Sequence, residues 1–184
     1  IDPRFMALYG ETIPRFGDLR GEDHHNMELI VQPKYVWLTT GKGTWTNMLG
    51  AKNIAKKAAG VDTFRYIPVN HLEESNFELV DQKKFLTLSE NKPVYSHGIV
   101  VCSEKDPCLS VSVGALTDVD WGCVYYSARY KLNEVENLHC EVEDYLVRRY
   151  EYTIKKQAGS PTISTISQEV KKDRWSAVVA MAMI

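Results

Sequence analysis

The sequence lacks the features that mark secreted, membrane-spanning or strongly nucleic-acid-binding chains. Its four cysteines show no CxxC spacing and no Asn-x-Ser/Thr sequon occurs, which favours a reducing compartment. No apolar run reaches the ~18 residues of a membrane span, and we expect no signal peptide. The formal net charge of −2 provides no long-range positive field to gather phosphate chains.

The composition is that of a folded domain rich in aromatic residues. A chain of 184 residues fits one domain with a true core, and 44% hydrophobic with 25% charged residues disfavours disorder of the whole chain. Ten tyrosines and four tryptophans suit half-buried pleated surfaces and contact patches. We therefore expect a soluble, β-rich domain that acts through its surface.

Three regions are expected along the chain. Residues 1–26, rich in turn formers and charge, are predicted to be an N-terminal arm, residues 27–157 a β-sandwich core, and residues 158–184 a second, C-terminal arm. The first methionine is Met6, so the start at Ile1 matches either proteolytic release from a polyprotein or added non-native residues. The apolar run 177–184 is expected to be covered by a neighbouring molecule.

Period-two alternation predicts most elements of the core as strands. Residues 123–132 give the clearest alternation, and one modest helix is expected between Thr44 and Gly60. Residues 138–156 satisfy both a strand and a helix of period near 3.6, and we favour the strand. Further strands are predicted within 27–40, 61–69, 75–80, 83–90, 93–104 and 109–119. Seven or eight short strands with turns between them indicate a sandwich or barrel.

Two motifs resemble known sites but lack required residues. The run Gly41-Lys42-Gly43-Thr44 does not have the Walker spacing, so we interpret it as a turn. His71-Leu72-Glu73 with Pro107-Cys108 matches half of a zinc deaminase signature, but position 111 is valine where a second cysteine is needed. Neither motif predicts a site.

The remaining reactive residues form no recognisable catalytic set. Cys102 or Cys123 would need His97 or His139 beside it to act as a nucleophile, and a buried apolar role is expected instead. Solvated or surface positions are expected for the histidine pair, the carboxylate clusters and the basic clusters: His24-His25; Glu73-Glu74, Glu141, Glu143 and Asp144; Lys52, Lys56, Lys57, Lys83, Lys84, Arg148, Arg149, Lys155, Lys156, Lys171 and Lys172. We predict no catalytic, cofactor-binding or metal-binding residue and no enzyme.

Two segments resemble capsid proteins of picorna-like viruses. Residues 9–19, YGETIPRFGDL, resemble a short phrase that precedes the jelly roll, and residues 114–116 with 120–132 resemble its late glycine-then-alternating strand. The resemblance implies an eight-stranded antiparallel jelly-roll sandwich with one short helix and extended terminal arms. It also implies a structural subunit of an icosahedral capsid, similar to a small coat protein of the cheravirus or secovirus type.

Partners and location follow from that resemblance. The expected partners are other capsid subunits, of the same or of other kinds, and no membrane is expected. Genomic RNA is a possible further partner, but not through a basic arm. The expected location is the virion, and the host cytoplasm during assembly. Two alternatives stay open: a viral movement or matrix-type protein that binds RNA or membrane, and a cupin-like metal enzyme with His97 and His139 as ligands.

Overall fold

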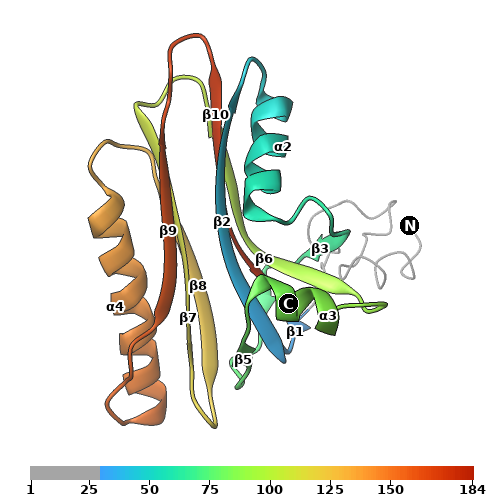
Figure 1. Ribbon diagram of the computed structural model, residues 1–184. Helices are drawn as coiled ribbons and strands as arrows, with labels where there is room; N and C mark the ends of the chain where they lie inside the picture. The colour runs from blue at the N-terminus through green and yellow to red at the C-terminus, as the bar shows by residue number, and fades with distance from the viewer. Residues whose placement is uncertain (1–29) are drawn as a thin grey trace, which may run out of the picture.

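The computed structural model describes residues 30–184, which form two β-sheets packed face to face with a helix against each outer face (Figure 1). Strands hold 42% and helices 25% of the described residues, so the prediction of a mainly β protein is confirmed. The predicted N-terminal arm, residues 1–26, lies outside the described residues.

The larger sheet has five strands in the order β3-β6-β10-β2-β5. Its central strand, β10, runs antiparallel to both long neighbours, from Trp175 opposite Trp45 to Met183 opposite Trp37 on one side. The bounds are β2 Tyr35–Trp45, β3 Tyr66–Pro68, β5 Glu78–Leu79, β6 Val94–Ser103 and β10 Trp175–Met183. The predicted strand at 93–104 is therefore confirmed as β6.

The smaller sheet has three antiparallel strands in the order β8-β7-β9. They are β7 Cys108–Thr117, β8 Gly122–Arg129 and β9 Thr162–Glu169, and the alternation at 109–119 and 123–132 predicted the first two. A separate parallel pair joins β1 Ile30–Val31 to β4 His71–Leu72.

Helix α2, Met48–Ala59, confirms the one helix expected from the sequence and covers the five-stranded sheet. Asn47 caps its start by accepting the Gly50 N–H at 2.7 Å, and Gly60 ends it at a positive φ of 78°. Its buried face is made of alanines at every fourth position: Ala51, Ala55 and Ala59.

The glycines of the Gly41-Lys42-Gly43 run lie inside β2, so their interpretation as a turn is wrong. A Cβ on Gly41 would stand 2.3 Å from the Ala55 carbonyl oxygen, and one on Gly43 would stand 2.6 Å from the Ala55 nitrogen. The glycines are needed because the backbones of β2 and α2 nearly touch.

Helix α4, Val135–Ile154, covers the three-stranded sheet, so the preference for a strand at 138–156 is wrong. Leu138, Val142, Leu146 and Tyr150 are buried at a spacing of four, and this periodicity outweighs the many β-branched and aromatic residues of the segment. The strand expected at 83–90 is also replaced by a helix, α3 Gln82–Leu88. It is capped by Asp81 and anchored by the buried Phe85.

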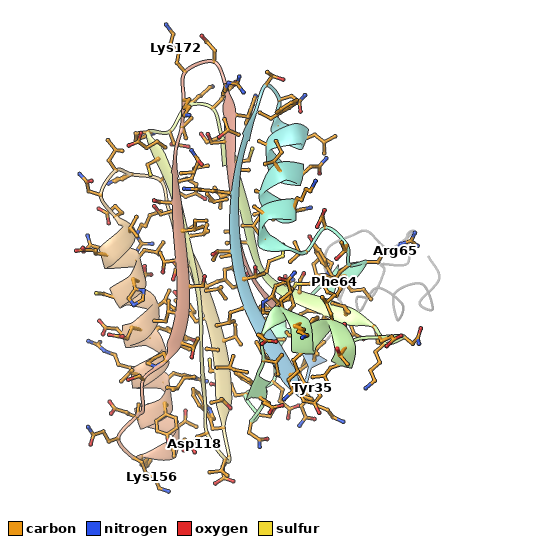
Figure 2. The ribbon with its side chains drawn as sticks, viewed as in Figure 1. Tyr35, Phe64, Arg65, Asp118, Lys156 and Lys172 are labelled. Atoms are coloured by element: carbon orange, nitrogen blue, oxygen red, sulfur yellow. The ribbon has the colours of Figure 1, made fainter. Side chains whose placement is uncertain are left out.

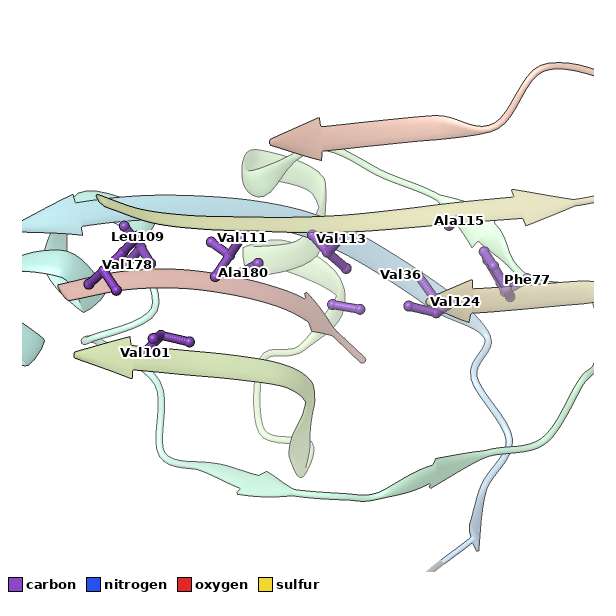
Figure 3. Packing of buried hydrophobic residues seen from close by; sticks show 11 residues of the cluster. Val36, Phe77, Val101, Leu109, Val111, Val113, Ala115, Val124, Val178 and Ala180 are labelled. Atoms are coloured by element: carbon purple, nitrogen blue, oxygen red, sulfur yellow. The ribbon is translucent and has the colours of Figure 1, made fainter. Parts of the chain in front are cut away.

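The main core lies between the sheets (Figure 3). Leu109, Val111 and Val113 of β7 face Val178 and Ala180 of β10, and all five side chains are fully buried. Alternate residues of β10 point to the other side, where Val179 packs under α2. A strand buried on both faces is apolar throughout, which explains the run WSAVVAMAM.

Residues 158–184 do not extend as the predicted arm but supply β9 and β10. The apolar run expected to be covered by a neighbour is instead covered by this chain's own β7 and α2. Jelly-roll connectivity and eight strands are not confirmed, since β1–β4, β2–β5 and β3–β6 are parallel pairs. Residues 30–184 also contain three helices, where one short helix was expected.

Candidate functional site

The feature of the described residues best suited to a macromolecular partner is a pair of unpaired strand edges. Among the strands of residues 30–184, β9 pairs only with β7, so no other strand of this part of the chain covers its second edge from Thr162 to Glu169. An open edge presents backbone N–H and C=O groups that can receive a strand from another chain.

The second open edge belongs to β2. The Val36 carbonyl accepts the Val80 N–H at 3.0 Å, but the pairing of β2 with β5 covers only Tyr35 and Val36. Backbone groups alternate in direction along a strand, so those of Leu38, Thr40 and later even-numbered residues point to the same side with no strand to meet them among the described residues.

The two edges lie side by side on one flank of the sandwich, between α4 and α2 (Figure 1). The Thr40 and Ser164 hydroxyls join them by a hydrogen bond of 2.9 Å. A neighbouring chain could therefore pair with the edge strands of both sheets, β9 and β2, on the same side of the molecule.

The two edges differ in protection against pairing. Strand β2 carries the exposed Lys42 at the middle of its open edge, whereas β9 has no charged residue before Glu169. Charged and proline residues are the usual means of keeping an edge from pairing, and Pro161 only precedes β9. The β9 edge is consequently the more available of the two.

Several residues considered in the sequence line a separate cavity of about 250 Å³ between β8, α4 and the chain near β4. Arg149 donates to Glu74 through Nε at 2.9 and 3.2 Å, and this pair accounts for one of the carboxylates expected to be a plain surface charge. Tyr125 and Tyr145 stack beside it with ring centroids 3.9 Å apart.

The thiol of Cys123 in this cavity is held protonated. Burial, followed by the nearby Glu74 carboxylate, raises the pKa of Cys123 to about 12. Only the thiolate is nucleophilic, so Cys123 is inert near neutral pH, in line with the small buried filler expected from the sequence. Burial also lowers the pKa of His97, whose Nδ1 lies 3.1 Å from the Val69 carbonyl oxygen.

The structure does not bring the two proposed metal ligands together. His97 lies between the sheets with its ring centroid 4.9 Å from that of Tyr126. His139 belongs to α4, and its Nδ1 lies 3.3 Å from the Thr165 hydroxyl of β9. No cluster of three His, Cys, Asp or Glu side chains suited to a metal occurs within residues 30–184.

The other reactive residues are also dispersed. Cys102 is half-buried in β6 beside the start of α2, Cys108 is buried in β7 and Cys140 is exposed on α4. Glu141 pairs with Arg129, whereas Glu143 and Asp144 are exposed as expected. The pair His24-His25 lies outside the described residues.

Comparisons of the sequence with protein-family models and with curated proteins found no match. No helix within the described part of the chain is both long and apolar enough to cross a membrane.

Sequence reasoning missed the open edges because they depend on strand order. The run TISTISQE does carry a local signal, since hydroxyl and β-branched residues in place of continuous apolar ones are typical of a strand only partly buried. That signal was assigned to an arm.

Proposed function

We propose that the protein is an assembly subunit, which joins neighbouring chains through its open flank. The observation that carries this proposal is the open β9 edge, unprotected by charge up to Glu169 and lying beside the partly open β2 edge. Strand addition at such an edge gives affinity through backbone hydrogen bonds.

Within that class we propose a coat-protein subunit of an icosahedral virus, acting with other capsid subunits around an RNA genome in the virion. The two-sheet β core supports this more specific proposal. The jelly-roll connectivity belongs to the same proposal, and the three parallel pairings count against it. The cupin-like metal enzyme loses its support because His97 and His139 lie on different faces of the smaller sheet.

The test is the size of the purified protein in solution, by sedimentation velocity and by electron microscopy with any neighbouring coat proteins co-expressed. We expect discrete oligomers or particles. A protein that stays monomeric at all concentrations would overturn the assembly proposal, and closed small oligomers without particles would overturn only the capsid proposal.

A paired variant connects assembly to the β9 edge. Thr162→Lys with Ser164→Lys places two charges along that edge and should dissociate the oligomer, because charges on an edge oppose strand pairing. The matched control is Thr63→Lys with Thr153→Lys, two exposed threonines away from both edges, with the same change in charge. Equal dissociation by both variants would mean that net charge, and not the β9 edge, controls association.

A further inference from the structure

A cavity of about 640 Å³ opens beside the C-terminal end of α2, away from the open edges. Its walls come from the last turns of the helix and from residues 61–66 after it, where Figure 2 labels Phe64 and Arg65. This volume is in the range of small-molecule sites, ~300–1,000 Å³.

The cavity is positively charged although the whole chain is not. Lys56, Lys57 and Arg65 line it against a single carboxylate, Asp62, whereas the formal charge of the chain is −2. The ion pairs found within residues 30–184 join other residues, so none of these three cations pairs with a carboxylate of that part of the chain. Three cations that line one cavity favour a ligand with more than one negative charge.

The uncharged part of the wall includes two aromatic side chains, Phe64 and Tyr66. Phe64 packs against Trp37 and Phe85, with ring centroids 6.2 and 5.7 Å away, and Tyr66 lies in β3. Val61, which also lines the cavity, is fully buried. A planar ring in the ligand would therefore meet aromatic surface that needs little rearrangement.

Helix stabilisation alone does not account for this arrangement. Lys56 and Lys57 lie in the last turn of α2, where positive charge offsets the helix dipole. Arg65, however, lies beyond the helix in the extended segment that leads into β3, and it contributes to no helix end. Its presence in the same cavity points to a ligand.

We propose that this cavity binds a phosphate monoester carried on a planar ring, that is, a mononucleotide-type ligand. The three cations bind the phosphate, and Phe64 and Tyr66 contact the ring. The proposal goes beyond the assembly function, since none of its residues belongs to β2 or β9.

The test is calorimetric titration of the full chain with adenosine monophosphate, adenosine and inorganic phosphate at two salt concentrations. We expect the monophosphate to bind at least about tenfold more tightly than either fragment, with affinity that falls as salt rises. Equal binding of adenosine would overturn the role of the cations, and equal binding of inorganic phosphate would overturn the role of the ring. No binding of the monophosphate would overturn the proposal entirely.

Variants separate the cavity from general charge effects. Arg65→Gln should weaken binding of the monophosphate about tenfold. Lys172→Gln makes the same change of charge at the β9–β10 turn, at the far end of the molecule in Figure 2, and should leave binding unchanged. Equal weakening by both variants would contradict a local site.

A further titration distinguishes binding of a mononucleotide from binding of a nucleic acid. A short single-stranded RNA should bind no more tightly per phosphate than the monophosphate. Binding of RNA alone would overturn the small-ligand proposal in favour of an RNA contact, and neither result depends on the oligomeric state.

Discussion

The two helices of this protein cover their sheets in opposite ways. Helix α2 buries three alanines and rests on the glycines of β2, so that backbone meets backbone. Helix α4 buries two leucines, a valine and a tyrosine, and its side chains fill the space above β7. The five-stranded sheet therefore packs closely against α2 because the residues between them are small. The three-stranded sheet packs against α4 through large side chains that fill the space between them.

The largest expected effect comes from removing bulk under α4. Leu146 is fully buried against Val142 and Gly114, so Leu146→Ala should leave a cavity and lower the free energy of unfolding by about 3 kcal/mol. Ala55→Gly in α2 should cost only about 1 kcal/mol through helix propensity. Urea denaturation of both variants measures the difference, and equal losses would contradict the contrast.

Adding a methyl group to a glycine should destabilise the α2 side of the protein more than the α4 side, the opposite of the order expected when side chains are shortened. A Cβ on Gly41 meets backbone atoms of Ala55 and Ala59, which cannot yield without moving α2, so Gly41→Ala should cost about 2 kcal/mol. A Cβ on Gly114 meets the ends of the Val142 and Leu146 side chains, and Gly114→Ala should cost about 1 kcal/mol or less. Thermal denaturation would refute this if Gly114→Ala proved the more damaging change.

The cysteines of the two layers should respond differently to alkali. The pKa of Cys123, raised by burial to about 12 in the folded chain, lies well above that of an unfolded thiol, about 8.5. The protonated thiol therefore contributes fully to stability below pH ~8.5, and this contribution is lost as the pH rises toward 12. At pH 10 the free energy of unfolding should be lower by about 1 to 2 kcal/mol for this reason.

The control for that titration is Cys102, in the α2 layer, whose pKa is also raised by burial but which is only half-buried. Cys123→Ala should flatten the loss of stability between pH 8 and 10 more than Cys102→Ala does. The measurement is urea denaturation across this pH range. A pH dependence that Cys123→Ala leaves unchanged, or changes less than Cys102→Ala does, would contradict the raised pKa of Cys123.

The smallest expected effect concerns the helix starts. Asn47 caps α2 through its side chain, whereas Glu134 at the start of α4 makes no such bond. Asn47→Ala should cost about 1 kcal/mol and Glu134→Ala a few tenths at most, measured by urea denaturation. A larger loss at Glu134 would show that α4 depends on its first turn more than the structure indicates.

Local pattern was enough to predict β7, β8 and α2. Strand β7 is buried on both faces, and it still alternates because Leu109, Val111 and Val113 fill the core between the sheets while small residues such as Gly114 lie under α4. Helix α2 shows its period and its terminal glycine. Helix α4 was misread because its tyrosines and valines favour strands, and only the sheet beneath it decides the matter.

Tertiary context explains the other failures. The glycines of β2 were interpreted as a turn because the sequence does not show that α2 packs directly on them. The segment of β10 was interpreted as an arm because the sequence does not show that β2 and β6 pair with it on both sides. The open edges and the cavity at Cys123 combine segments far apart in sequence, whereas the cavity beside the C-terminal end of α2 is lined by residues 53–66 alone. No local pattern encodes such combinations.

Strand β10 has a consequence for how the chain folds during synthesis. Its two neighbours, β2 and β6, leave the ribosome long before it does, yet they are not bonded to each other in the finished sheet. Until β10 is synthesised, β2 and β6 each have an unpaired edge on the side that β10 will occupy. Unpaired edges of this kind favour slow folding and mispairing. We therefore expect the five-stranded sheet to form slowly, because its central strand is the last strand of the described residues to be made.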